Sequence, residues 1–322
     1  MKANQAVGVV IPSWNSVDLL PRCLGSLSDQ GVSVELLVVD NGSSDGSVSY
    51  LQEQGVEHLA LPQNVGFAAA VNLGASRLSA AAILALNADT VLEPGCIGAL
   101  AEALAADAKL GGVQPRILQL EEGREMDPAG ARLYSCGQAL TRDGRGIEEG
   151  AGAEQTPAHL AGHEIFGVCG AACLLRRELF DDLGGYDERY FAFCEDVDLN
   201  VRAQIAGWRF GYVPEATVWH VGNASWQAGF KSPGAENARL VARNRLATQL
   251  KFMPLTALPR IAVVEVGALL RAASQRRLRA TLGGKLAALR WLPALLRERA
   301  RLRGEGDPRR ARRWLGRRTV AT

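Results

Sequence analysis

Three carboxylates lie close together in the segment YFAFCEDVDLNVRAQIAGW, residues 190–208. Glu195, Asp196 and Asp198 follow apolar and aromatic residues, where a charge is costly unless it is paired. A carboxylate in such a place can serve as a general base, because burial and neighbouring negative charge raise its pKa. Asp198 and Arg202 have the i,i+4 spacing of an ion pair on a predicted helix. Asp196 is therefore the first candidate for a base and Glu195 the second, with a helix N-cap as the alternative role of Asp196.

Two further polar clusters follow predicted strands. VVDNGSSDGS places Asp40 and Asn41 after one strand, and LNADT places Asn87 and Asp89 after another. Ligands of open parallel sheets bind beyond the carboxyl ends of the strands, so both clusters can share one ligand. Asp40 suits an N–H of a nucleobase or a ribose hydroxyl, and Asp89 suits a hard cation such as Mg²⁺. The alternatives are a turn former for Asp40 and a helix cap for Asp89.

Between these clusters lies the stretch NVGFAAAVNLG. Asn64 and Gly66 precede a predicted helix of small residues, and Asn72 lies inside that helix. A helix N-terminus attracts negative charge, so this one can face a diphosphate. Close packing of the small residues on a sheet is the structural alternative.

The residues before 115 alternate between two hydrophobic periodicities. Apolar runs at 7–11, 34–39, 56–61 and 82–86 predict buried strands. Amphipathic stretches predict helices, and Pro21 moves the start of the first helix to about Leu19; these stretches are 17–27, 47–54, 66–77 and 95–106. Repeated strand–helix units of this length predict an α/β fold with a parallel, doubly wound sheet.

The rest of the chain has a less regular pattern. Residues 119–163 predict a loop with a hairpin. EIFGVCGAACLLRRELF then predicts a strand followed by a helix, RFGYVPEATVWH a strand and ENARLVARNRLATQLKF a helix.

Charge is distributed unevenly along the 322 residues. Residues 271–322 hold 16 basic and 3 acidic residues, a net charge of +13, and the remainder carries −11. Residues 255–302 mix arginines with Leu, Ala and Trp291, a pattern typical of a helix at a membrane interface that anionic lipids attract. A solvated helix, or docking onto the acidic body, is the alternative. We expect no nucleic-acid partner, because no recognition module accompanies the charge.

The cysteines and the N-terminal residues indicate the cellular compartment of the protein. Six cysteines occur without a CxxC pair, which predicts buried free thiols in a reducing compartment. Neither a signal peptide nor an uninterrupted apolar run of about 18 residues is evident. We expect a cytoplasmic protein whose basic C-terminal segment can reach the inner face of the membrane.

Eight motifs in order resemble those of the family 2 glycosyltransferases with the GT-A fold, and most closely the bacterial rhamnosyltransferase-like branch. The resemblance covers about residues 5–250 and implies a GT-A domain over 1–252, with a nucleotide-sugar half at about 1–115 and an acceptor half at about 116–252. A helical, basic extension would follow over 253–322. The motifs are PSWN, VVDNGSSDGS, NVGFAAAVNLG, LNADT, GACLLRRELF, GGYDERYFAFCEDVDL, AGWRFGYVPEATVWH and ARNRL.

The resemblance also implies roles for individual residues. Asp89 would bind a divalent cation, Mg²⁺ or Mn²⁺, with His220 touching the metal or the leaving diphosphate. Asn87 stands where the family's DxD-type motif has its first acid, so the diphosphate must supply more of the coordination. Asp196 would be the catalytic base beside Glu195. The residues implied to bind the nucleotide-sugar donor are Asp40 at the base, Pro12, Asn15, Asn41, Asn64, Gly66, Asn72, Asn87 and Asp89.

The activity implied is inverting, metal-dependent transfer of a sugar, with rhamnose suggested by the branch. The donor would be a nucleoside-diphosphate sugar and the acceptor a hydroxyl of a glycan or lipid-linked glycan in cell-envelope or surface polysaccharide synthesis. Arg243 and Asn244 could bind phosphate or cap a helix. One alternative is a sugar nucleotidyltransferase, which would want a basic, Gly-rich loop that VIPSWNSVDLL lacks. The other is a sugar-nucleotide-binding protein without transfer activity.

Overall fold

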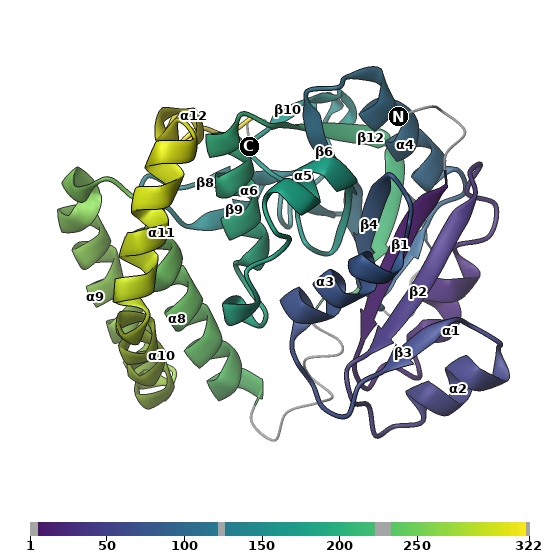
Figure 1. Cartoon of the computed structure of the whole chain (residues 1–322), viewed down its shortest axis with the longest axis horizontal. Coiled ribbons are helices and arrows are strands. Elements are labelled where there is room, and N and C mark those ends of the chain that lie inside the picture. The colour runs from purple at the N-terminus through teal and green to yellow at the C-terminus, as the bar shows by residue number, and fades with distance from the viewer. Residues whose placement is uncertain (1–5, 122–125, 223–232, 320–322) are drawn as a thin grey trace.

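A computed structural model describes residues 6–121, 126–222 and 233–319. In these residues a central sheet of ten strands has the order β10-β12-β6-β11-β4-β1-β2-β3, with β5 beside β12 and β7 beside β6 (Figure 1). The strands are β1 (Val7–Ser13), β2 (Val34–Asp40), β3 (His58–Ala60), β4 (Ala82–Leu86), β5 (Thr90–Leu92), β6 (Leu110–Gln119), β7 (Leu133–Ser135), β10 (His163–Ile165), β11 (Ala172–Arg176) and β12 (Arg209–His220).

The sheet is parallel in its N-terminal half and mixed beyond it. Strands β3, β2, β1 and β4 run parallel, as do β6 and β12. Strand β11 lies antiparallel between β4 and β6, so the sheet is not wholly parallel. The predicted α/β class, with a mostly parallel sheet flanked by helices and followed by C-terminal helices, is confirmed.

Helices cover both faces of the sheet, because the side chains of β1 alternate between two cores. Val9 and Ile11 join the core beneath α4, whereas Val10 joins the core beneath α3 and α6. Close packing of α3 requires Gly74, since a Cβ there would lie 2.4 Å from a Val10 methyl. The helices of this part are α1 (Leu20–Gly25), α2 (Ser47–Glu53), α3 (Phe67–Arg77), α4 (Cys96–Ala106), α5 (Arg177–Asp182) and α6 (Glu195–Ala206).

The segment predicted as a loop with a hairpin contains one. Strands β8 (Gln138–Leu140) and β9 (Gly146–Glu148) pair antiparallel as a separate two-stranded sheet. The side chain of Asn200 on α6 donates to Gln138 Oε1 at 2.9 Å and to the Val168 carbonyl at 2.8 Å. These bonds attach the hairpin to α6.

Five α-helices follow within residues 233–319 and lie together at the side of the molecule remote from β2 and β3 (Figure 1). Helix α10 packs against α8, where Gly284 lies close to the backbone of Arg239. Trp314 and Leu302 then pack with Val201 of α6. None of the described helices is long and apolar enough to cross a membrane. The five are α8 (Pro233–Phe252), α9 (Leu258–Ser274), α10 (Leu278–Arg290), α11 (Leu292–Glu305) and α12 (Pro308–Arg312).

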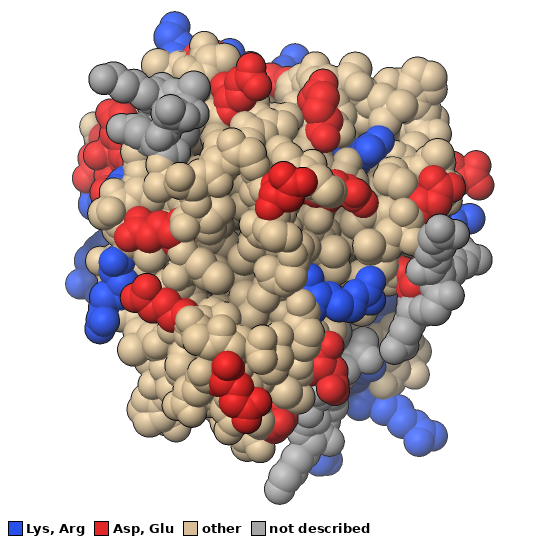
Figure 2. All heavy atoms as spheres, turned by 90° about the vertical axis from the view of Figure 1, so that its right-hand side faces the viewer, with Lys and Arg blue, Asp and Glu red and all other residues tan. Residues whose placement is uncertain are grey.

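The acidic part of the chain and the basic helices occupy different sides of the molecule. Acidic side chains are spread over the face that includes β2, β3, α1 and α2, while Lys and Arg lie mostly towards its margins (Figure 2). All six cysteines are free, five of them buried and Cys194 partly exposed, which confirms the prediction of free thiols.

The predicted Asp198–Arg202 ion pair is confirmed and belongs to a larger buried network. Asp198 is fully buried and accepts from Arg202 Nε at 2.6 Å and from Lys251 Nζ of α8 at 2.7 Å. Lys251 also lies 3.0 Å from Glu298 of α11. The network therefore connects the helix that carries Asp196 to the C-terminal helices.

We expect Asp198→Ala to lower the free energy of unfolding by about 3 kcal/mol, because the buried Arg202 loses its carboxylate partner and the buried Lys251 keeps only its more distant ones. Urea denaturation measures the change. The exposed i,i+4 pair Arg301–Glu305 offers the control, and Glu305→Ala is expected to cost at most about 1 kcal/mol. Equal losses in both variants would contradict a structural role for Asp198.

Candidate active site

One cavity of about 310 Å³ collects most of the residues predicted to do chemistry. It lies where β4 and β12 end and α6 begins, next to the β8–β9 hairpin. We call it the active-site cavity. Its polar lining residues are Asn87, Asp89, Tyr134, Gln138, Glu148, Cys169, Glu195, Asp196 and His220.

Asp89 and His220 form a buried pair. Strand β5 runs antiparallel to β12 with Thr90 opposite His220, and this register brings the two side chains together. His220 Nε2 lies 3.1 Å from Asp89 Oδ1 and 3.4 Å from Asn87 Nδ2. The ring of Tyr134 packs edge-on against His220 with the centroids 4.4 Å apart. The pair is thus fixed by β-sheet pairing and packing.

The donor atoms of this pair fit a divalent cation. Adjacent ligands of an octahedral ion lie about 3 Å apart when each metal–ligand bond is about 2.1 Å, and Asp89 Oδ1 and His220 Nε2 are 3.1 Å apart. A carboxylate oxygen suits Mg²⁺ and Mn²⁺, and an imidazole nitrogen suits Mn²⁺ better than Mg²⁺. His220 Nδ1 is buried without a hydrogen-bond partner among the described residues, so no protein contact fixes the tautomer from that side.

Asp196 is the second residue of α6 and lies at the edge of the active-site cavity, partly exposed. The N-cap of α6 is Cys194, so the cap alternative for Asp196 is wrong. Its Oδ2 accepts from Gln138 Nε2 at 2.7 Å and from the Gly170 N–H at 3.1 Å. Burial raises the pKa of Asp196 even though these hydrogen bonds oppose the shift. An accessible carboxylate with a raised pKa has the properties of a general base.

Glu195 differs from Asp196 in its access to the cavity. Its side chain is only 6% exposed, and its Oε2 has no hydrogen-bond partner among the described residues. Burial, followed by the negative charge of Asp196, raises the pKa of Glu195 well above its usual range. A carboxyl group in that environment favours its neutral form, so Asp196 is the better placed of the two.

Gln138, Glu148 and Cys169 also line the active-site cavity, although the sequence did not single them out. Glu148 bonds to Ser135 Oγ and to Gln138 Nε2, and burial followed by the charge of Asp196 raises the pKa of Glu148 to about 7. One donor atom each of Glu148, Cys169 and Asp196 lies within 4.8 Å of the others, which makes them a second set that could hold a metal. A signal in the sequence is the Asp143-Gly144 pair, which is typical of a hairpin turn but does not show which side chains of the hairpin face α6.

A smaller cavity of about 110 Å³ adjoins the active-site cavity. Phe67, Asn87 and Ala192 line both, so the two spaces lie side by side. Four predicted donor-binding residues reach this smaller cavity in addition to Asn87: Pro12, Asn41, Asn64 and Gly66.

Asp40 lies at the end of β2 and is 1% exposed. Its Oδ2 accepts from the Ser43 N–H at 2.9 Å, whereas its Oδ1 has no partner among the described residues. Ser13 Oγ, on the neighbouring strand, likewise lacks one. Buried polar atoms are nearly always bonded, so two such atoms at one sheet edge are typical of a site that a polar ligand completes.

Two of the predicted donor-binding residues form hydrogen bonds to neighbouring loops. Asn15 Oδ1 accepts from the Ser44 N–H at 2.9 Å and so joins the loops after β1 and β2. The amide of Asn72 bonds to the backbone of Tyr186 and to Glu188, and Asn72 lines neither cavity. Helical spacing placed Asn72 on the correct helix, but its face of α3 packs on the 185–188 loop.

Arg243 and Asn244 hold the loop that leads into α6. Asn244 Nδ2 donates to the carbonyls of Tyr190, Ala192 and Phe193, at 2.7–2.8 Å. Arg243 donates to the Tyr190 carbonyl and lies over the Trp291 ring, 4.7 Å from its centroid. Phe191, Phe193 and Cys194 have positive φ, which costs energy that such contacts must offset. The contacts of Arg243 and Asn244 within the chain thus hold a loop and do not cap a helix.

Gly66 allows the loop that leads into α6 to lie close to the start of α3. Its φ of +91° and ψ of 167° are open only to glycine, and a Cβ would lie 2.5 Å from the Phe191 carbonyl oxygen. We expect Gly66→Ala to lower the melting temperature by several degrees and to weaken nucleotide binding. Gly283→Ala on α10, where a Cβ meets no atom within 4 Å, is the matched control and is expected to leave both unchanged or raise stability slightly. Similar melting temperatures for the two variants would contradict this account of Gly66.

The α/β sheet brings two adjoining cavities, an Asp–His pair and an accessible carboxylate to one edge, an arrangement that suits a glycosyltransferase with the GT-A fold. Residues 8–184 match the model of "Glycosyl transferase family 2". The chain belongs to this family, and both the predicted family and its rhamnosyltransferase-like branch are confirmed.

Curated and solved relatives agree with this assignment. The chain is 32% identical over 239 residues to the N-acetylglucosaminyl-diphospho-decaprenol L-rhamnosyltransferase of Mycobacterium tuberculosis, covering 66% of this chain and 75% of the relative. GalNAc-T7, solved with UDP, GalNAc and Mn²⁺, superposes with a TM-score of 0.56 at 16% identity, over 78% of this chain and only 51% of that one. A mannosyltransferase of Pyrobaculum calidifontis, solved with GDP-Man and Mn²⁺, gives a TM-score of 0.51 at 18% identity, over 94% and 86%. The two structures share the fold.

Proposed function

We propose that the chain transfers a sugar, with inversion, from a nucleoside-diphosphate sugar to a hydroxyl of a lipid-linked glycan during cell-envelope polysaccharide synthesis. Rhamnose is the sugar named for the mycobacterial relative, and a diphospho-decaprenol glycan is that relative's acceptor. The observation that carries the proposal is the active-site cavity, which Asp89, His220 and Asp196 all line. A divalent cation at Asp89 and His220 completes the proposed site.

The residues of this chain divide the chemistry between them. Asp40 Oδ1 and Ser13 Oγ would bond to the donor's nucleoside, and the small cavity beside Gly66 would hold its diphosphate side. The cation, when bound, acts as a Lewis acid on the departing diphosphate. Asp196 takes the proton of the acceptor hydroxyl, while Gln138 and the Gly170 N–H hold its carboxylate in position.

A panel of nucleotide sugars tests this proposal. The purified protein is incubated with UDP-, GDP- and dTDP-sugars and Mn²⁺, and release of nucleoside diphosphate is measured together with thermal stabilisation. We expect one donor to be hydrolysed slowly and to raise the melting temperature. Stabilisation without turnover, with or without an added glycan acceptor, would support the non-catalytic binding alternative and contradict our proposal.

The pH dependence of the reaction is expected to depend on Glu148. Burial and the charge of Asp196 raise the pKa of Glu148 to about 7, so Asp196 ionises first and Glu148 is still protonated when it does. We expect Glu148→Gln to remove the titration near pH 7 from the kcat/KM profile and to leave the acidic limb, which would report Asp196, in place. Glu154→Gln, an exposed change outside the active-site cavity, should leave the whole profile unchanged. A shift of the acidic limb in Glu148→Gln would contradict this order of ionisation.

A further inference from the structure

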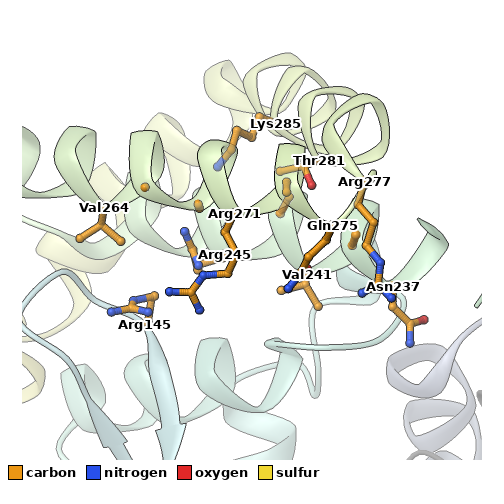
Figure 3. A pocket seen from close by; sticks show the side chains of 15 residues that line it. Arg145, Asn237, Val241, Arg245, Val264, Arg271, Gln275, Arg277, Thr281 and Lys285 are labelled. Carbon is orange, nitrogen blue, oxygen red and sulfur yellow. The ribbon is translucent and has the colours of Figure 1, made fainter. Parts of the chain in front are cut away.

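A cavity of about 540 Å³ lies between α8, α9 and α10, and its walls are cationic (Figure 3). Arg145 comes from the turn between β8 and β9, and Arg245 from α8. Arg271 and Arg277 flank the turn that joins α9 to α10, and Lys285 lies on α10. Figure 3 shows Arg145, Arg245 and Arg271 turned towards a common space. We call this cavity the cationic pocket.

The positive charge of the cationic pocket is only partly neutralised. Asp143 pairs with Arg145 at 2.6 Å, and Glu265 pairs with both Arg245 and Lys285. Among the described residues, Arg271 and Arg277 have no carboxylate partner. Two carboxylates therefore face five cations. An Arg-rich cavity with excess positive charge is suited to phosphate, which guanidinium groups bind in a bidentate manner.

The cationic pocket adjoins the active-site cavity at two places. Val241 of α8 lines both spaces. Arg145 lines the cationic pocket, and the next residue, Gly146, lines the active-site cavity. A phosphate in the cationic pocket would thus lie one layer of side chains from the cavity that contains Asp196.

Exposed apolar side chains border the cationic pocket on α9. Val263, Val266 and Leu270 are 73%, 57% and 69% exposed. Their helical spacing puts them on one stripe, next to the stripe that carries the pocket residues Val264 and Arg271.

Helix α10 repeats this arrangement. Leu282 and Leu289 are 41% and 48% exposed and lie beside the pocket residues Thr281 and Lys285. Contiguous exposed apolar surface marks an interaction site. A cationic pocket that suits an anion therefore lies beside a surface that suits an apolar group. This combination indicates a ligand with a phosphate head and an apolar chain.

We propose that the cationic pocket binds the phosphate or diphosphate of the lipid-linked acceptor, with the acceptor's sugar in the active-site cavity and its apolar chain along α9 and α10. This inference rests on the proposed function, because it assigns the second substrate of the same reaction. It gives the basic C-terminal helices a role in acceptor binding: α9 and α10 supply both the cations and the apolar surface that one lipid phosphate requires.

Binding of farnesyl diphosphate tests the assignment, with inorganic pyrophosphate and farnesol as the separate head and chain. We expect farnesyl diphosphate to bind more tightly than either part. The double variant Arg271→Gln/Arg277→Gln is expected to weaken its binding at least tenfold. Arg290→Gln/Arg297→Gln, an equal charge change at exposed residues outside the pocket, should have little effect. Equal weakening in both double variants would overturn the proposal.

Two further measurements test the apolar surface and the donor reaction separately. The double variant Val266→Asn/Leu270→Gln should weaken the binding of farnesyl diphosphate but not the binding of pyrophosphate. Pyrophosphate binding as tight as that of farnesyl diphosphate would overturn the lipid assignment in favour of a free phosphate ligand. Hydrolysis of the sugar donor by water involves no acceptor, so it should survive in Arg271→Gln/Arg277→Gln. Its absence from the wild-type protein would contradict the proposed function, whereas its presence without farnesyl diphosphate binding would contradict only the acceptor site.

Discussion

Replacing Asp196 with Asn is expected to reduce kcat for sugar transfer about 10³-fold, within the range that general bases contribute. The amide keeps the shape of the carboxylate but cannot accept the acceptor's proton. We propose that donor binding involves Asp40 and the small cavity, so the affinity for nucleoside diphosphate should not change. Single-turnover transfer and calorimetric titration measure the two quantities separately.

Glu195→Gln is the matched variant, since Glu195 adjoins Asp196 but is 6% exposed. We expect it to retain at least a tenth of the wild-type kcat. If Glu195→Gln lowers kcat more than Asp196→Asn does, the catalytic base is Glu195. Loss of nucleoside diphosphate binding in Asp196→Asn would instead indicate a structural defect.

Asp89→Asn is expected to lower divalent-dependent transfer by at least about a hundredfold, a loss of roughly 2.7 kcal/mol in transition-state stabilisation. The charged oxygen that would bind the cation is lost, while the contact with His220 can persist. Activity measured against Mn²⁺ concentration should show that far more Mn²⁺ is needed. Binding of nucleoside diphosphate in the presence of Mn²⁺ should weaken as well.

Glu148→Gln provides the comparison for this variant. Glu148 belongs to the other set of side chains that could hold a metal, with Cys169 and Asp196. If Asp89 binds the cation, Glu148→Gln keeps its Mn²⁺ requirement unchanged. A large increase in the Mn²⁺ requirement of Glu148→Gln alone would move the metal to the Glu148 cluster.

Local periodicity was sufficient to predict four strands and four helices before residue 107, but it did not reveal β5 or β6. Strand β4 occupies the predicted residues 82–86, and α3 and α4 begin one residue after Gly66 and Gly95. Buried strands and amphipathic helices are specified by neighbouring residues, so they can be read without knowledge of the tertiary structure. The antiparallel insertion of β11 between β4 and β6 depends on strand pairing across distant segments, and strand periodicity does not reveal its direction.

The site was predictable where a motif ends a strand and unpredictable where a side chain reaches across the fold. Asp89 was chosen as a candidate because it follows a predicted strand, and Asp196 because it begins a predicted helix after an apolar segment. Gln138 and Glu148 were missed because their importance arises from contacts with Ser135 and Asp196 over a hairpin that has weak periodicity. The resemblance implied a donor contact for Asn72, whose helix was predicted correctly, but the direction of its side chain depends on the packing of the 185–188 loop against α3.

The position of the cation provides the most direct test. Crystals would be grown with Mn²⁺ and whichever of UDP, GDP and dTDP stabilises the protein most, and the Mn²⁺ located by its anomalous scattering. We expect one Mn²⁺ bonded to Asp89 and to the diphosphate, with the sugar-binding space open towards the Asp196 carboxylate. A Mn²⁺ bound instead by Glu148, Cys169 and Asp196, with Asp89 bonded only to His220, would contradict the proposed site.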